Sequence, residues 1–460
     1  MGAQVPVGGQ VSLEGMHSTV PVPPAEAGFW EHWRAFVGPA ILISVGYMDP
    51  GNWGTDLQGG AQFKYGLLWV VGLASLMAIF MQVISARLGV VTGKDLAQCC
   101  RDWYPAWTRW PNWLMCEVAI GACDLAEVLG SAVALNLLFH IPLLWAVIIT
   151  GLDVLLLLAL QRFGMRTIEA VVLLLVATIG VCYFIEIFVL PLTRPNFLEI
   201  GRALASPHFH HAGMLYVAIG IIGATVMPHN LYLHSALVQS RQVRRDEPSI
   251  GRAIHFNTID SVVALTVAFL VNAAILVLAA MVFFGKESVA VGGGQVVHFS
   301  ASSDWIRVAY LTLAPLLGTA AASTLFAVAL LASGQSSTIT GTLAGQVVME
   351  GFMHWRIQPW VRRLITRTLA ILPAVLVIGL RGDSSVTDLL TLSQVVLALQ
   401  LPFAMFPLLH FTSSRMRMGT WKSGWFLLIA GWASAIVITV MDLFGLPDSL
   451  RAAWQVVVGS

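Results

Sequence analysis

The chain has 460 residues, of which 57% are hydrophobic and only 11% are charged, whereas about 25% are charged in an average soluble domain. This composition excludes a water-soluble globular protein. The formal net charge of +1, without any basic run interleaved with aromatic residues, argues against nucleic-acid binding. Long apolar runs recur along the sequence, and the clearest reach the roughly 20 residues that a helix needs to cross a bilayer. Because these runs lack the alternation of barrel strands, the predicted fold class is an all-α membrane protein.

In chain order, residues 1–35 begin with a stretch rich in Gly, Pro and Val that has no basic start and no compact apolar core. We therefore expect a disordered cytoplasmic tail without a cleavable signal peptide. Hydropathy then predicts eleven transmembrane helices, at residues 36–61, 66–91, 112–139, 143–160, 167–190, 213–239, 256–284, 306–334, 360–380, 388–411 and 423–446.

The distribution of basic residues predicts the orientation of these spans. With the N-terminus in the cytoplasm, eighteen of the 25 Lys and Arg residues fall on the cytoplasmic side and seven on the opposite side. This bias agrees with the positive-inside rule, so we expect a multi-pass protein with a cytoplasmic N-terminus and an external C-terminus. The five cysteines have no metal-ligand spacing, and we interpret them as reduced packing residues: Cys99, Cys100, Cys116, Cys123 and Cys182.

Two of the predicted spans are interrupted near their middle. The first reads GPAILISVGYMDPGNWGTDLQGG, with Asp49 before Pro50, and the sixth reads YVAIGIIGATVMPHNLYLHSALV, with Met227 before Pro228. Proline removes a backbone donor and clashes with the preceding turn, so both helices should be broken there. Simple proline kinks are the alternative, but a kink does not need an adjacent carboxyl group at membrane depth.

The positions of the two breaks predict an internal symmetry. Spans 1 and 6 are equivalent if residues 36–411 form two five-helix repeats, and the second repeat is then inverted because five is odd. Residues 412–460 hold the eleventh helix and the C-terminus outside the repeats. Matching broken helices in inverted repeats are typical of the substrate site of a secondary transporter, so we expect a ten-helix transport core with its site near the midplane.

The residues at the breaks indicate what such a site would bind. They are Asp49, Asn52 and Met227, with freed backbone carbonyls around Gly46 and Ala224. Carboxylate and carbonyl oxygens are ligands for cations, and the soft thioether favours a transition metal over sodium, calcium or magnesium. A methionine in an apolar helix is usually a packing residue, but the position of Met227 beside the break and opposite a buried Asp favours a ligand role.

Four motifs, DPGN, MPHN, CDLAEVLGSA and GQSSTITGTLAGQVVMEGF, resemble those of the Nramp family of divalent-metal transporters, over residues 36 to 446. The resemblance implies a LeuT-type 5+5 fold with discontinuous helices 1 and 6, no enzymatic activity, and no cofactor, since the metal is the cargo. It also implies proton-coupled uptake of manganese and iron, with cadmium, cobalt and zinc as further substrates. By motif position, the implied metal ligands are Asp49, Asn52, Met227, the carbonyl of Ala224, the carbonyl of Gly46, where many relatives have alanine, and Gln394, which approaches the ion during occlusion.

Acidic residues on the third span suggest a proton path. Glu117, Asp124 and Glu127 lie on much the same helix face, and an ionisable residue inside a membrane is a functional candidate. His229 follows the second break, and histidine titrates near neutral pH. An alternative is static ion pairing that holds spans 3 and 9 together. The resemblance implies that proton coupling involves Asp49, Asp124, Glu127 and His229, with Arg362 or Arg363 as counter-ion.

Two other classes of protein remain as alternatives. A sodium- or proton-coupled amino-acid or organic-solute transporter on the same fold would offer small residues and free helix termini to its substrate, which Asp49 and Met227 fit poorly. A membrane-embedded enzyme would need a catalytic motif, and the sequence contains neither an HExxH pair nor an evident paired catalytic Asp motif. The expected partners are therefore divalent metal ions, protons and the lipid bilayer of the cell membrane, without nucleic acid or an obligate protein partner.

Overall fold

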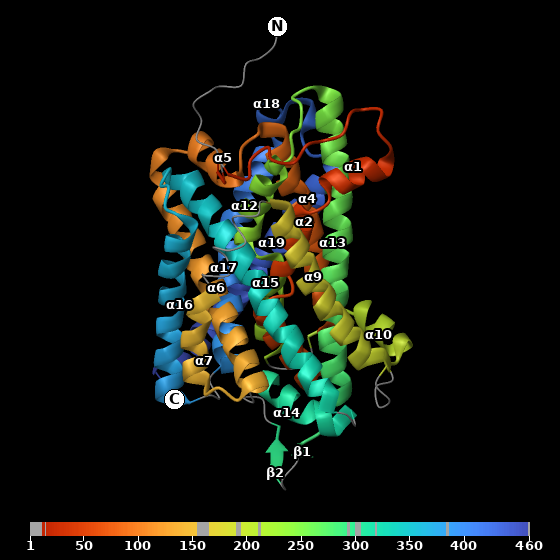
Figure 1. Cartoon of the computed structure of the whole chain (residues 1–460), viewed down its shortest axis with the longest axis vertical. Coiled ribbons are helices and arrows are strands. Elements are labelled where there is room, and N and C mark those ends of the chain that lie inside the picture. Colours follow the sequence, from red (N-terminus) through yellow and green to blue (C-terminus); the bar gives the residue numbers. More distant parts are fainter. Residues whose placement is uncertain are drawn as a thin grey trace.

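The computed structural model describes residues 12–13, 15–153, 165–189, 195–209, 213–291, 295–299, 305–317, 320–382 and 386–458. Within these ranges the chain is a bundle of long helices with one antiparallel hairpin, β1 (Ser288–Val291) and β2 (Gln295–His298). Figure 1 shows α1 (Phe29–Phe36), α5 (Leu96–Trp103) and α18 (Arg415–Met418) at one end of the bundle, with the hairpin at the other. The predicted all-α membrane fold is confirmed.

Most predicted spans correspond to single long helices. These are α4 (Leu68–Thr92), α6 (Arg109–Phe139), α9 (Met165–Phe184) with its π-helical continuation η3 (Ile185–Val189), α13 (Glu247–Val282), α16 (Pro359–Arg381), α17 (Val386–Ser413) and α19 (Trp425–Val458). The fourth predicted span begins as α7 (Leu143–Ile149) and η2 (Thr150–Leu152), and its residues 154–160 lie outside the described residues. The remaining short helices are η1 (Ala106–Thr108), α10 (Phe197–Leu204), η4 (Val238–Ser240), α14 (Trp305–Leu317) and η7 (Gly419–Trp421).

Nine helical segments in the described part of the chain are long and apolar enough to cross a membrane. The first predicted span does not count among them because its break divides it into two short helices, and the fourth because only its beginning is described. The total of eleven crossings therefore stays a prediction.

Both predicted helix breaks are confirmed. The first span consists of α2 (Pro39–Gly46) and α3 (Pro50–Phe63), and the sixth consists of α11 (Met214–Val226) and α12 (Pro228–Leu237). Met227 joins the second pair with φ 37° and ψ 103°, a conformation that side-chain-bearing residues rarely adopt. Such strained residues occur where the surrounding structure holds them, commonly at functional sites.

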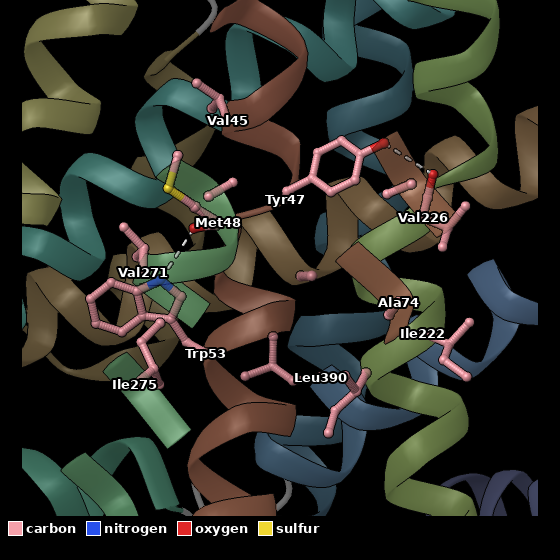
Figure 2. Close-up of a cluster of buried hydrophobic side chains, with 14 of the residues drawn as sticks. Val45, Tyr47, Met48, Trp53, Ala74, Ile222, Val226, Val271, Ile275 and Leu390 are labelled. Atoms are coloured by element: carbon pink, nitrogen blue, oxygen red, sulfur yellow. Dashed lines mark hydrogen bonds between the residues drawn. The ribbon is translucent and has the colours of Figure 1, made fainter. Parts of the chain in front are cut away.

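The backbone carbonyls released by the breaks accept hydrogen bonds from side chains of the first broken span and of α13. Trp53 Nε1 donates to the carbonyl of Met48 at 3.2 Å, and Tyr47 Oη donates to the carbonyl of Val226 at 3.5 Å, as Figure 2 shows. Asn272 Nδ2 of α13 donates to the carbonyl of Tyr47 at 2.7 Å. Unwound backbone at membrane depth persists only where protein satisfies it, and these bonds meet that need.

The bounds predicted for the eighth span were wrong. We expected a helix at 306–334 with the motif GQSSTITGTLAGQVVMEGF after it, whereas α15 (Ala320–Met353) contains the whole motif and α14 is a separate helix. The small and polar residues of the motif lower its hydropathy, but most of them are buried within the protein, and α15 packs against α6. A Cβ on Gly334, for example, would lie 2.2 Å from Ser131 Oγ.

The described part of the N-terminal segment also differs from the disordered tail that we expected. Leu13 and Val20 are buried, Val20 forms a parallel bridge with Arg241, and the backbone N–H of Leu13 donates to Glu350 Oε2 at 2.9 Å. Leu13 and Val20, which we expected in a disordered tail, thus lie over the ends of α12 and α15. We call residues 12–22 the N-terminal strap.

Candidate metal site between the two broken helices

The carboxyl group of Asp49 caps the second half of the first broken helix. Asp49 Oδ1 accepts hydrogen bonds from the backbone N–H of Asn52 at 2.9 Å and from Asn52 Nδ2 at 2.8 Å. The other oxygen, Oδ2, is buried and has no hydrogen-bond partner among the described residues. A buried carboxylate normally has its oxygens paired, so this free oxygen indicates a place for a cation or a proton.

The amide nitrogen of Asn52 marks the point where three oxygens converge. Besides Asp49 Oδ1, Asn52 Nδ2 donates to the carbonyl of Ala224 at 3.1 Å and to the carbonyl of Gly46 at 3.4 Å. These acceptors come from α3, α11 and α2, so the structure brings the predicted oxygen ligands of both broken helices within reach of one atom. A ring of acceptors around a single donor can also surround a metal cation.

Asn52 Oδ1 faces away from this point in the structure. It accepts from Asn272 Nδ2 at 3.1 Å and from Thr225 Oγ1 at 3.5 Å. The two ends of an amide are distinguished by their hydrogen bonds, and these partners assign the oxygen to the outer side. For Asn52 to serve as an oxygen ligand, its amide group must therefore rotate.

The sulfur of Met227 lies at the edge of the oxygen cluster. Met227 is 0% exposed, and a Cβ on Gly46 would lie 3.1 Å from Met227 Sδ. Met227 also shares a small buried cluster with Cys123 of α6 and Leu397 of α17. The side chain therefore lies within the protein beside the carbonyl-bearing end of α2, as the ligand prediction requires.

Gln394 approaches the site from α17. It is fully buried, and a Cβ on Gly51 would lie 2.0 Å from Gln394 Nε2, so the amide group packs on the first turn of α3. The structure thus packs Gln394 against Gly51, which follows Asp49 by two residues, and so places it next to the predicted ligands. Its role at the ion stays a prediction.

A buried cluster of charges lies on the neighbouring helices. Arg363 of α16 pairs with Asp124, with Glu127 at 3.1 Å and with Asp153 at 3.3 Å. Arg367 pairs with Asp153 and lies 3.7 Å from Glu127. Three carboxyl groups face two guanidinium groups, so the cluster has one excess negative charge when every carboxyl is ionised. We call these five residues the charge cluster.

The predicted proton-path residues divide between two places. Asp124, Glu127 and Arg363 lie in the charge cluster, whereas Arg362 pairs separately with Glu117 at 2.7 Å. Of the two counter-ion candidates, Arg363 is therefore the one that contacts Asp124 and Glu127. His229 is buried in the first turn of α12 and interacts electrostatically with Asp124.

Sequence reasoning missed two members of the charge cluster. Asp153 falls in the fourth predicted span, and its position as the one acidic residue in an apolar run could have marked it as a candidate. Arg367 is four residues after Arg363, which places the two on one face of α16. Gly341 of the α15 motif leaves room for the Glu127 carboxyl group, since a Cβ on Gly341 would lie 2.9 Å from Glu127 Oε1.

The described residues contain no group of three or more His, Cys, Asp or Glu side chains that could hold a metal ion. All five cysteines are buried, and none forms a disulfide among the described residues. The candidate site is therefore of a mixed type, with one carboxylate, backbone carbonyls, an amide and a thioether.

The model of the family described as natural resistance-associated macrophage protein-like, Nramp, matches residues 40–446. The chain belongs to the Nramp family. The resemblance that the motifs carried is thereby confirmed, as is the expectation of a transporter rather than an enzyme.

Relatives within the Nramp family match this chain over nearly its whole length. The divalent metal cation transporter MntH of Nostoc sp. is 49% identical over 443 residues, covering 95% of this chain and 96% of the relative. The protein of the same name from Bradyrhizobium diazoefficiens is 49% identical and covers 95% of this chain and 94% of the relative.

Solved structures agree with this assignment. The manganese transporter of Eremococcus coleocola, in complex with an aromatic bis-isothiourea compound, superposes with a TM-score of 0.85 at 39% identity, covering 96% of this chain and 91% of that one. Mhp1, a nucleobase-cation-symport-1 family transporter, has a TM-score of 0.55 at 12% identity, with 95% of each chain covered. The similarity to Mhp1 shows that the two proteins share a fold, which therefore also occurs outside the metal transporters.

Proposed function

We propose that this Nramp protein imports divalent transition-metal ions, manganese and iron above all, together with protons by alternating access. The observation that carries the proposal is the convergence of Asp49, Gly46 and Ala224 oxygens on one point, with the Met227 sulfur at its edge. Relatives named as divalent metal cation transporters, and a solved manganese transporter, support the same substrate class. Cadmium, cobalt and zinc share the affinity for sulfur and oxygen donors that makes them further candidate substrates.

Metal binding at this point would replace amide hydrogen bonds with coordination bonds. Asp49 would contribute its charge, the Gly46 and Ala224 carbonyls their dipoles, and Asn52 its oxygen after the amide rotates. Met227 would supply the soft donor that disfavours calcium and magnesium. Gln394 would close over the ion from α17.

The proposed cycle opens the site alternately to each side of the membrane, and the described structure has it closed. Asp49, Asn52 and Met227 are all buried. Toward the end that carries α1 and α5, Gln82 Nε2 donates to Tyr47 Oη at 2.8 Å, and the Gln82 oxygen bonds His234 Nδ1 at 2.9 Å. These bonds tie α4 to α2 and α12, so inward opening has to break them.

Proton coupling fits the excess charge of the charge cluster. One unpaired negative charge in a buried site is costly, and a proton removes it. The cluster is also connected to the metal site, because Cys123 packs in the Met227 cluster and its Sγ donates to Glu127 Oε1 at 3.7 Å. We therefore assign proton movement to Asp49, Asp124, Glu127 and His229, with Arg363 as counter-ion.

The proposed orientation has the N-terminus in the cytoplasm of a cell and the C-terminus outside. The arginine-bearing elements α1, α5 and α18 lie together at one end of the bundle in Figure 1, which is the arrangement that the positive-inside rule expects at the cytoplasmic face.

Uptake into proteoliposomes under an inward proton gradient tests the proposal. We expect saturable manganese entry with acidification of the lumen, loss of uptake in Asp49→Ala, and calcium entry in Met227→Ala. Alanine added as a competitor distinguishes the organic-solute alternative, because it should leave manganese uptake unchanged. Unaltered selectivity against calcium in Met227→Ala would contradict the ligand assignment. Asp124→Asn protein that transports metal with undiminished proton movement would leave that residue only its static, helix-holding role.

A further inference from the structure

Gly46 lies at a position where a larger residue would collide with the metal site. It is the last residue of α2, and a Cβ built on it would lie 2.3 Å from Asn230 Nδ2 and 3.1 Å from Met227 Sδ. Its φ is not in the left-handed region, so alanine would meet no backbone obstacle there. What the glycine provides at this position is therefore space for two side chains of the second broken helix.

Asn230 uses that space to bond the predicted sulfur ligand. It is the third residue of α12, is fully buried, and its Nδ2 donates to Met227 Sδ at 3.5 Å. Within the described ranges its Oδ1 has no hydrogen-bond partner, so the contact with sulfur is the one that orients the amide. A thioether sulfur is a weak acceptor, and a metal ion would compete with this N–H group for its lone pairs.

We infer that Asn230 and Gly46 are specificity-determining positioning residues, which weaken the sulfur ligand and so shift this transporter toward harder ions such as manganese and away from cadmium. The inference rests on the proposed function. Coordination by Met227 must displace the amide of Asn230, so this cost falls in full on an ion that depends on the sulfur, whereas an ion held mainly by the oxygen ligands can bind without displacing the amide. Because Gly46 leaves room for the amide, alanine at this position pushes the amide off the sulfur while the flexible Asn230 side chain absorbs the shift.

Metal binding to the purified full-length protein tests this inference. Dissociation constants for cadmium and manganese are measured by titration calorimetry for the wild type, Gly46→Ala, Asn230→Ala and Gly54→Ala. Gly54 is the matched control, since its Cβ would lie 3.4 Å from Leu390 Cβ, an ordinary contact. Thermal unfolding verifies that each variant is folded.

We expect Asn230→Ala to tighten cadmium binding about fivefold, the factor that one net hydrogen bond represents, and to change manganese binding less than about twofold, and we expect Gly46→Ala to raise the ratio of cadmium to manganese affinity by a similar factor. The double variant should gain no more than either single variant, because both remove the same bond. The ¹¹³Cd resonance of bound cadmium should shift toward greater sulfur ligation in both, and Gly54→Ala should resemble the wild type.

Two further results separate this inference from the proposed function. If Met227→Ala loses cadmium affinity while Gly46→Ala and Asn230→Ala keep the wild-type ratio of cadmium to manganese affinity, the ligand set stands and the inference is wrong. If Met227→Ala binds cadmium as the wild type does, the ligand set fails and the inference fails with it. Should Gly46→Ala not fold, an unchanged ratio in Asn230→Ala alone overturns the inference.

Discussion

Replacing Arg363 with methionine should expose how the charge cluster is balanced. Methionine fills a similar volume but removes the guanidinium that contacts Asp124, Glu127 and Asp153. With all carboxyl groups ionised, the cluster then changes from one to two excess negative charges, and Arg367 becomes its last cation. The Asp124 side chain loses the one guanidinium that pairs with it in the described structure.

The burial of the Arg363–Asp124 ion pair determines how much stability we expect this substitution to remove. Arg363 and Asp124 are both buried, and breaking a buried ion pair by removing one partner costs about 3 to 5 kcal/mol because the other charge is left uncompensated. An exposed pair is worth only about 0 to 1 kcal/mol. The pair of Lys64 with Glu199, whose side chains are 40% and 42% exposed, is the matched control for this comparison.

The assay is reversible unfolding in mixed micelles, applied to Arg363→Met, Lys64→Met and the double variant Arg363→Met/Asp124→Asn. We expect the free energy of unfolding to fall by about 3 to 5 kcal/mol in the first and by less than about 1 kcal/mol in the second. The double variant restores one excess charge and should recover much of the loss. An Arg363→Met protein as stable as Lys64→Met would refute the charge balance.

Three further predictions concern other parts of the fold. Alanine at Gly130, whose Cβ would lie 2.1 Å from Pro50 Cβ, should lower the free energy of unfolding by about 1 to 3 kcal/mol and weaken manganese binding. The control is alanine at Gly121 of the same helix, where an added Cβ has nothing within 4 Å, and calorimetry should show neither change. Burial raises the pKa of Asp95, the N-cap of α5, to about 6. An acid with a raised pKa contributes stability below its unfolded value of about 3.9 and loses it as the pH rises through about 6, so Asp95→Asn, which keeps the cap, should melt higher than the wild type above pH 6 and equally near pH 4. Deleting residues 2–22 should speed hydrogen exchange of the Gln242 N–H, which donates to the Val20 carbonyl at 2.9 Å; unchanged protection would mean that the strap does not persist in solution.

Local chemistry was enough to predict several features. The proline breaks follow from a missing backbone donor at Pro50 and Pro228, and the membrane fold follows from the length of the apolar runs. Asp49 and Met227 could be selected as candidate ligands because each stands directly before the proline of a break, and a carboxyl group at membrane depth has no ordinary packing role. Each of these inferences needs only neighbours in sequence.

Other features depended on contacts between distant segments. Asp153 and Arg367 joined the charge cluster because α6, α16 and the segment after η2 meet, and no periodicity within one helix predicts which charges will pair between helices. The sequence prediction ended the eighth span before the α15 motif because a hydropathy scale scores every residue as if it faced lipid. Small residues of the motif such as Gly334 and Gly341 face other helices instead.

The sequence by itself thus determined that this is a membrane transporter with two interrupted helices and determined which residues stand at the interruptions. Only the tertiary structure decided how those residues are held. It oriented the Asn52 amide through Asn272 and Thr225, placed Met227 and Asn230 against Gly46 of the other broken helix, and folded Leu13 and Val20 onto the bundle. The physical reason is that a hydrogen bond or ion pair is specified by geometry over a few ångströms, and segments hundreds of residues apart reach that geometry only after the chain has folded.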